Sequence, residues 1–461
     1  MPTLSEILVK KDYTQKQPSQ FFYKDSPFWQ KLLTLAFVGL LTCSALGESK
    51  TIMLSLGALP KGITVGIICL AIGYGFIYPD SKRIQTILRP TLIFMLLMAS
   101  LLLWSMVIWI LNFAAKASMI RACSKIAFQS ISILTAVSAV YLFGARAIDL
   151  FAIGACLANA GIMILEVPAY GIGPSIQSLI TCIVTFGDAV GYARQLEIHD
   201  LTFMFGQLIL YYAVFAPHKT AKENRRRWLL LLSCSFFFFI GMKRIAIPAV
   251  ILFIFIGLFF RKRKNLRPFL LLWGIAWIIF FLFYLYIVHN GIFSQLLNAF
   301  GIDMMGRDHF WMMANDYYDL SPFYMGKGFE YVDTIVTNWY HAGLINHPYP
   351  FHNDILKVFV ELGCPGFFLW SGIQYVLYPL FWLHHSDEQT TLLYMCELSY
   401  MTITYMTDNT AFYFWSTMAL RLLPLCYSIE RKKKPKPEVW KPRDKKEMHE
   451  HIRVLMQETQ E

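Results

Sequence analysis

Apolar runs long enough to cross a lipid bilayer recur along almost the whole of this 461-residue chain. A membrane-spanning helix needs about 20 consecutive apolar residues, and a soluble core could not bury so many runs of that length. The composition agrees, because 56% of the residues are hydrophobic and only 15% are charged, whereas ordinary soluble domains have roughly 25% charged residues. We therefore predict an all-α, polytopic integral membrane protein of the plasma membrane.

The hydropathy pattern predicts about twelve transmembrane helices. Their expected ranges are 32–47, 61–78, 89–113, 125–143, 147–165, 200–216, 228–242, 245–260, 268–288, 355–383, 391–406 and 410–428. Residues 171–187 are also apolar. If they were a thirteenth span, either the Lys82-Arg83 loop or the basic strip at Arg225 would lie outside the cell. We interpret them as a re-entrant segment or as a helix lying at the membrane interface.

Short basic strips between the apolar runs predict the orientation, because cytoplasmic loops carry an excess of Lys and Arg. The strips are Arg225-Arg226-Arg227, the run Arg261-Lys262-Arg263-Lys264 and the run Arg431-Lys432-Lys433-Lys434. With these strips inside, the outer segments are the Lys243-Arg244 hairpin tip, residues 289–350 and Asp408-Asn409. His384-His385 and both termini are then cytoplasmic. The net charge of +11 lies in such strips, so we expect no nucleic-acid partner.

Five parts follow from this topology. They are a cytoplasmic N-terminal segment at 1–31, transmembrane helices one to nine at 32–288, a large extracytoplasmic loop with an interfacial helix at 289–354, transmembrane helices ten to twelve at 355–428, and a basic cytoplasmic tail at 429–461. No cleavable signal precedes the first apolar run, so we expect that run to remain as an anchor. The nine cysteines form no CxxC pair and predict no disulfide framework.

Two groups of cations lie on the predicted outer side. Outer segments usually carry few Lys and Arg residues, so Lys243 and Arg244 at the hairpin tip are unexpected there. The planar guanidinium of Arg244 suits the binding of a lipid-linked diphosphate. The alternative is simple contact of these side chains with lipid headgroups. In the outer loop, residues 304–319 suit an amphipathic helix on which Arg307 and Trp311 share one face, which suits an anionic headgroup or a sugar. The alternative is an interfacial helix in which Trp311 is an aromatic belt residue.

A histidine at the junction between the outer loop and the next span is the best candidate for acid–base chemistry. His352 can accept a proton from a sugar hydroxyl near neutral pH, and Asp354 is either the base itself or the group that orients the histidine. The alternative for a single histidine at this place is a structural role. A metal site from His341, His347, His352 and Asp354 is disfavoured, because the spacings match no standard ligand motif. The chain has neither a Walker-type loop nor a GxSxG elbow, so nucleotide hydrolysis and a serine nucleophile are not expected.

Three motifs, in order along the chain, resemble those of the bacterial O-antigen ligase and polymerase superfamily. The first match is Phe351-His352-Asn353-Asp354-Ile355-Leu356, continued by Glu361-Leu362-Gly363-Cys364-Pro365-Gly366. The others are Lys243-Arg244, where the family carries an external arginine, and Gly306-Arg307 through Trp311 with Pro322 and Gly326-Lys327-Gly328. The resemblance covers roughly residues 228 to 385. The hairpin arginine departs from the pattern, because it follows Lys instead of Ser and precedes Ile instead of Gly.

The resemblance implies a fold like that of the C-type glycosyltransferases and a metal-independent, inverting glycosyltransferase without a cofactor. Its donor would be an undecaprenyl-diphosphate-linked glycan. The implied roles are diphosphate binding by Arg244, Arg307 and Lys243, activation or positioning of the acceptor hydroxyl by His352, and support of the site by Asn353, Asp354, Glu361 and Trp311.

The leading hypothesis is a polysaccharide polymerase that joins lipid-linked oligosaccharide repeat units at the outer face of the plasma membrane, for capsule, exopolysaccharide or O-antigen. The alternative within the family is an O-antigen ligase that transfers the finished glycan to another acceptor. A flippase for lipid-linked oligosaccharide, or a structural or sensory membrane protein, represents other classes, but transporters usually carry central charges in their spans. Expected partners are the lipid-linked donor and acceptor, membrane lipids and other polysaccharide-assembly proteins.

Overall fold

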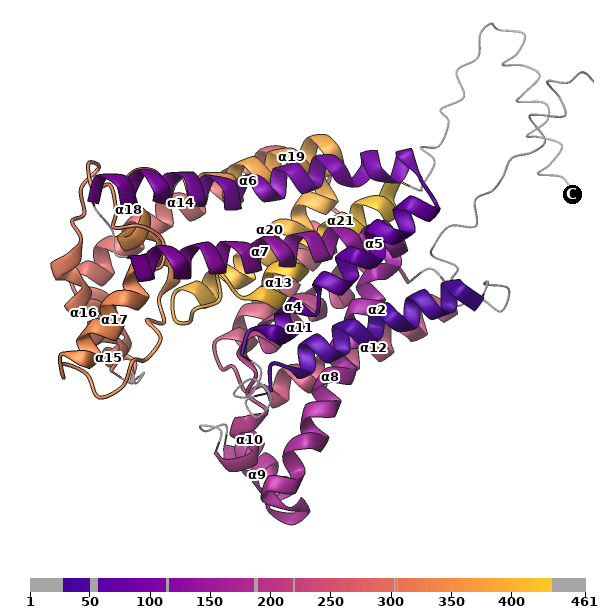
Figure 1. Cartoon of the computed structure of the whole chain (residues 1–461), viewed down its shortest axis with the longest axis horizontal. Helices are drawn as coiled ribbons and strands as arrows, with labels where there is room; N and C mark the ends of the chain where they lie inside the picture. The colour runs from indigo at the N-terminus through magenta and orange to yellow at the C-terminus, as the bar shows by residue number, and fades with distance from the viewer. Residues whose placement is uncertain are drawn as a thin grey trace, which may run out of the picture.

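The computed structural model describes residues 28–49, 57–112, 116–185, 190–218, 220–301, 304 and 306–432. Every regular element in this part of the chain is a helix (Figure 1), which confirms the predicted all-α class. Most of the predicted N-terminal segment and of the predicted C-terminal tail lies outside the described residues.

Each of the twelve ranges predicted as spans overlaps a helix. In the first half of the chain the helices are α2 (Phe28–Leu46), α4 (Leu59–Gly62), α5 (Val65–Ile77), α6 (Ser81–Asn112), α7 (Lys116–Phe143), the 3-10 turn η2 (Gly144–Arg146), α8 (Ala147–Tyr170), α9 (Ile172–Thr185), α10 (Gly191–Gln195), α11 (His199–Leu210), the π-helical turn η3 (Tyr211–Phe215), α12 (Ala221–Ile240) and α13 (Ala246–Phe260).

The second half begins with a long apolar helix, which is followed by residues 289–354, the predicted extracytoplasmic loop, here termed the outer loop. Its elements are α14 (Arg267–His289), α15 (Ile292–Ala299), α16 (Arg307–Ala314), the 3-10 turn η4 (Asn315–Tyr317), α17 (Tyr331–His341), α18 (Asp354–Gly372), the π-helical turn η5 (Ile373–Leu377), α19 (Tyr378–His385), α20 (Glu388–Tyr405) and α21 (Phe414–Lys432). The single helix expected over 304–319 is therefore shorter, and α16 begins after Gly306, whose φ is +76°.

Six helical stretches in the described residues are long and apolar enough to cross a membrane. They are Phe28–Leu46, Leu59–Ile77, Ser81–Leu111, Ser118–Tyr170, Arg267–His289 and Asp354–His385. Two shorter apolar helices, Ile172–Thr185 and Ala246–Phe260, accompany them. The other predicted spans are helical but shorter or more polar, so the count of twelve crossings stays a prediction.

The segment with ambiguous topology forms the short helix α9. Gly171, with φ +80°, ends α8 and reverses the chain, and α9 lies with α10 beyond the main bundle (Figure 1). Its 14 residues span about 21 Å at 1.5 Å per residue, which is short of a hydrocarbon core of about 30 Å. Its length suits the predicted re-entrant or interfacial position.

The helices of the outer loop gather at one end of the bundle. Figure 1 shows α15, α16 and α17 together at the left, beside one end of α6, α7 and α18. The chain between α20 and α21 lies at the same end. This arrangement brings segments that are far apart in sequence to one end of the molecule, where the candidate site lies.

Candidate functional site

The hairpin tip between α12 and α13 directs Lys243 inward. Gly241 packs closely on Thr202, because a Cβ atom added at position 241 would lie only 2.1 Å from the threonine hydroxyl oxygen. The next residue, Met242, has a φ of +47°. This tight turn brings Lys243 Nζ to 2.8 Å from Glu197 Oε1 and 3.8 Å from Asp408 Oδ2. Lys243 Nζ also lies 3.1 Å from His199 Nε2. Arg244, the next residue, is exposed.

His352 is held by the loop that joins α20 to α21. Its Nδ1 lies 3.3 Å from Asp408 Oδ1, and its backbone N–H donates to Asn409 Oδ1 at 2.9 Å. The φ of His352 is +52°, a left-handed conformation that is uncommon for a residue other than glycine and is found at functional sites. Two side chains of one loop thus fix both the backbone and the ring of this histidine.

The second arginine motif meets the same loop. Arg307 Nη1 donates to the Thr407 carbonyl oxygen at 2.8 Å. One helical turn later, Trp311 is buried, with 2% of its surface exposed, and its Nε1 donates to the Phe351 carbonyl oxygen at 3.0 Å. The two residues share a face of α16, as predicted, and this face docks α16 onto the residues that flank His352.

Asp408 is the electrostatic centre of this cluster. Burial raises the pKa of its carboxyl group, but the hydrogen bond from His352 and the positive charge of Lys243 outweigh burial and hold that pKa below its usual range. A carboxylate accepts but does not donate hydrogen bonds. Nδ1 of His352 is therefore the protonated nitrogen in the neutral ring, and Nε2 carries the lone pair.

Asn353 and Asp354 anchor the start of α18. The Asn353 side chain accepts from the Leu356 N–H at 3.0 Å as the helix N-cap, and it donates to the Tyr284 hydroxyl at 3.0 Å. Asp354 is buried, and its Oδ2 accepts from the Ala411 N–H at 2.6 Å. The carboxylate that contacts the imidazole is thus Asp408, whereas Asp354 binds the backbone of the α20–α21 loop.

The Glu361–Gly366 motif packs directly on the Gly326–Gly328 turn. Gly363 has a φ of +66°, and a Cβ there would lie 2.4 Å from the Gly326 nitrogen. Pro365 has no N–H to donate to the Glu361 carbonyl oxygen four residues earlier. Instead, that oxygen accepts from the N–H groups of Lys327 at 3.0 Å and Gly328 at 2.7 Å. The helix α18 is therefore interrupted at Gly363, and the carbonyl group that this interruption leaves free binds the Gly326–Gly328 turn of the outer loop.

A network of charges, among which Lys357, Glu330 and Glu361 are buried, supports the same junction. Lys357 Nζ lies 2.9 Å from Asp333 Oδ1, 3.5 Å from Glu330 Oε1 and 3.9 Å from Glu361 Oε1. Lys125 of α7 reaches Glu330 Oε1 at 2.7 Å. Burial raises the pKa of Asp333, but the charges of Lys357 and Lys125 and the hydrogen bonds with Glu330 and Lys357 together outweigh burial and lower it. These ion pairs tie α17 to α7 and α18.

Sequence reasoning missed several of these residues. Asp408 and Asn409 were noted only as a topological marker, and Thr407, Glu197 and His199 were not singled out at all. Lys357 and Glu361 could have been recognised as a pair, because an i, i+4 Lys and Glu inside an apolar span need each other. An acidic residue in a short loop gives no comparable signal, and its partners depend on tertiary packing.

The histidines considered as metal ligands do not converge. The rings of His341 and His347 lie 5.6 and 6.3 Å from that of Tyr340, whereas His352 lies against Asp408. Across the described ranges, no group of three or more His, Cys, Asp or Glu side chains is arranged to hold a metal ion.

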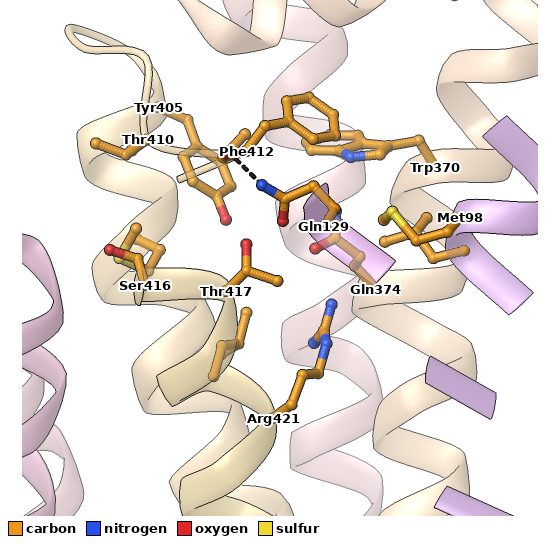
Figure 2. A pocket seen from close by; sticks show the side chains of 14 residues that line it. Met98, Gln129, Trp370, Gln374, Tyr405, Thr410, Phe412, Ser416, Thr417 and Arg421 are labelled. Carbon is orange, nitrogen blue, oxygen red and sulfur yellow. Dashed lines mark hydrogen bonds between the residues drawn. The ribbon is translucent and has the colours of Figure 1, made fainter. Parts of the chain in front are cut away.

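A small cavity with both polar and apolar walls lies beneath the α20–α21 loop (Figure 2). Arg421 of α21 points into it from below, and Gln129 of α7 donates to the Phe412 carbonyl oxygen above. Within the described part of the chain, Nε and Nη1 of Arg421 have no hydrogen-bond partner. The space is about 10 Å³, which holds roughly one water molecule. This cavity is too small for a sugar, so the cluster around His352 remains the candidate site.

One comparison with known proteins identifies a family. The model of a family described as O-Antigen ligase matches residues 229–371, a range that contains Lys243, Arg244, Arg307, His352 and Glu361. No curated protein matches the chain. The match confirms the resemblance of the three motifs, while the α20–α21 loop lies beyond the matched range. Over residues 229–371 the chain is thus similar to the O-antigen ligase and polymerase superfamily of glycosyltransferase-like enzymes, and its long apolar helices suit a multi-pass membrane protein.

Proposed function

We propose that the chain is a polysaccharide polymerase, which joins undecaprenyl-diphosphate-linked oligosaccharide repeat units at the outer face of the plasma membrane. The observation that carries this proposal is the meeting of three separate motifs at the α20–α21 loop. Lys243 and His352 contact Asp408, and Arg307 contacts the neighbouring Thr407. Cations for a diphosphate and a base for a hydroxyl thus belong to one site.

In the proposed reaction, the acceptor hydroxyl oxygen attacks the anomeric carbon of the donor sugar from the side opposite the diphosphate. The new glycosidic C–O bond forms as the bond from that carbon to the diphosphate oxygen breaks, and the diphosphate leaves with the electron pair. The hydroxyl proton passes to Nε2 of His352. Asp408, at Nδ1, stabilises the imidazolium that results. The configuration at the anomeric carbon is inverted, and the step needs neither a metal ion nor a cofactor.

Arg307 and Arg244 are the proposed ligands of the diphosphate. The contact with Thr407 uses one of the five N–H donors of Arg307, so donors remain for the diphosphate. A guanidinium can bind two phosphate oxygens at once. Positive charge placed beside the leaving oxygens stabilises the charge that develops there. Because the diphosphate is already a good leaving group, the site needs no pair of carboxylic acids of the glycosidase type.

In this scheme Lys243 mainly positions Asp408, whereas the family resemblance implies that it binds the diphosphate. Its ammonium lies against Glu197 at 2.8 Å and near Asp408 at 3.8 Å, so much of its charge is used within the protein. We assign it to holding Asp408 in place behind His352, with a long-range contribution to diphosphate binding. Asn353, Asp354, Glu361 and Trp311 position the junction through the contacts described above.

Transfer of a finished glycan to another acceptor is the second candidate function. It is favoured by the description of the matching family as O-Antigen ligase, and the same residues would perform the same bond exchange. We favour polymerisation, because polymerases occur in many organisms that have no lipid A to receive a glycan. A flippase would belong to another class and would not need a base at His352.

Single replacements of Arg244, Arg307 and His352 by Ala test the proposal in cells that produce the glycan. For a polymerase, the glycan on a gel collapses to single repeat units. For a ligase, long chains form but stay on the polyprenyl lipid. For a flippase, lipid-linked units accumulate on the cytoplasmic face. Arg225→Ala in the basic strip of α12 is the matched control. Glycan of normal length on its normal acceptor with all three variants would overturn the proposed site.

A further inference from the structure

A second pocket lies between α6 and α19, at a distance from the outer loop. Its volume is about 580 Å³, and its walls are formed by Arg89, Leu92 and Ile93 of α6 and by Phe381, His384 and His385 of α19. The Tyr378 hydroxyl donates to the Phe94 carbonyl oxygen at 3.1 Å and joins the two helices. In Figure 1, α19 lies beside α6, away from α15, α16 and α17.

One end of this pocket is cationic. Arg89 lines it directly and is exposed. Arg267, at the start of α14, reaches its rim, because Arg267 Nη2 donates to His384 Nε2 at 3.2 Å. His384 Nδ1 donates to the Leu380 carbonyl oxygen at 2.7 Å, so the imidazole is fixed between the helix backbone and the guanidinium. The nearby Glu388 accepts from the Leu266 N–H at 3.0 Å.

Apart from His385, whose ring stacks on Phe381, the remaining walls of the pocket are apolar. Leu92 has 62% of its surface exposed, and Ile93 and Phe381 are half-buried beside it. Pockets of roughly 300–1,000 Å³ are typical of small-molecule sites. A cationic end next to apolar walls between two membrane helices matches a lipid with a phosphate headgroup, since basic pockets at the cytoplasmic side of transmembrane helices bind anionic lipid headgroups.

We propose that this pocket binds an anionic phospholipid. Arg89 and Arg267 contact the headgroup phosphate, and the first part of an acyl chain lies along Leu92, Ile93 and Phe381. On the predicted topology His384 is cytoplasmic, so the lipid belongs to the inner leaflet. The site shares no residue with the cluster around His352 and does not depend on the proposed reaction.

The test uses the purified full-length chain in a neutral detergent and measures its thermal unfolding. The probes are phosphatidylglycerol, phosphatidylcholine and inorganic phosphate. We expect phosphatidylglycerol at saturation to raise the Tm by about 2–5 °C and the other two to raise it by less than about 1 °C. Phosphatidylcholine tests whether the net negative charge is needed, and inorganic phosphate tests whether the lipid is needed.

Two variants test the position of the site by different means. Arg89→Gln removes one charge, whereas Leu92→Trp fills the apolar part and leaves all charges in place. We expect each to abolish at least about two-thirds of the rise in Tm caused by phosphatidylglycerol. Arg225→Gln, an equal charge change in another basic strip, keeps the full rise.

The opposite outcomes overturn the proposal. If inorganic phosphate gives the same rise as phosphatidylglycerol, the pocket is a free-phosphate site and the lipid is excluded. If Arg225→Gln reduces the rise as much as Arg89→Gln does, the lipid effect is diffuse attraction to basic loops. A full rise with both pocket variants would show that phosphatidylglycerol binds elsewhere.

Discussion

Replacement of Asp408 by Asn removes the negative charge beside His352, the proposed base, while keeping the shape of the Asp408 side chain. The amide oxygen can still accept from Nδ1 of His352, so the ring keeps its orientation. What disappears is the negative charge that lies 3.3 Å from Nδ1 and that stabilises the imidazolium formed during transfer. We therefore expect the turnover rate to fall and the affinity for the donor to change little.

The size of the effect follows from the distance. Two unit charges 3.3 Å apart interact by roughly 5 kcal/mol at an effective dielectric constant of about 20. The side chains of His352 and Asp408 are 19% and 7% exposed, and Lys243 shares the carboxylate at 3.8 Å. If about half of the interaction survives this screening, roughly 2–3 kcal/mol is lost, which corresponds to about a 30- to 150-fold lower kcat.

The assay is the joining of lipid-linked repeat units by the purified chain, with kcat and KM measured separately. Asp316→Asn is the matched control, because Asp316 is an exposed carboxylate in the same outer loop. We expect this control to keep the wild-type kcat. A kcat of Asp408→Asn within about twofold of the control value, less than about 0.5 kcal/mol, would refute the role assigned to Asp408.

Three further predictions follow. Arg307→Lys keeps the charge but loses the planar fork, so we expect the KM for the lipid-linked donor to rise about tenfold; an unchanged KM in steady-state kinetics would contradict diphosphate binding by Arg307. Gly363→Ala places a Cβ 2.2 Å from the Met325 carbonyl carbon at a φ of +66° and should cost at least about 2 kcal/mol in chemical or thermal unfolding. Gly372→Ala in the same helix has open space around it and should be neutral or stabilising by less than about 1 kcal/mol; equal losses would contradict the close contact at Gly363. The lowered pKa of Asp408 means that its carboxylate stabilises the fold above the unfolded value of about 3.9 and loses this contribution as the pH falls further. The difference in Tm between the wild type and Asp408→Asn should therefore shrink as the pH falls below about 4, and a difference that keeps growing below about pH 4 would contradict this.

The helices could be predicted from the sequence because their signal is local. Each apolar run carries its own length and periodicity, and all twelve predicted ranges overlap helices. The predicted ends of the helices are less accurate than their positions. α12 begins at Ala221, before the predicted start at 228, because Thr220 and Glu223 form a capping box and the basic strip that was read as a loop belongs to the helix.

The site could be predicted only in part. Lys243, Arg307 and His352 stand out by chemical type and motif, but their shared partner is the loop of Thr407 and Asp408. His352 and Asp408 are 56 residues apart in sequence. Their contact depends on how α18, α20 and α21 pack, which no local pattern specifies. Arg421, buried in α21, was also missed, although a charge inside a predicted span marks a residue for attention.

The location of the site outside the membrane is tested most directly by chemical accessibility in intact cells. In a chain whose native cysteines are replaced by Ser, single Arg244→Cys and His384→Cys variants are treated with a maleimide that cannot cross the membrane. We predict that position 244 reacts in intact cells and that position 384 reacts only after the cells are permeabilised. Reaction of position 244 only after permeabilisation would contradict the proposed outer site.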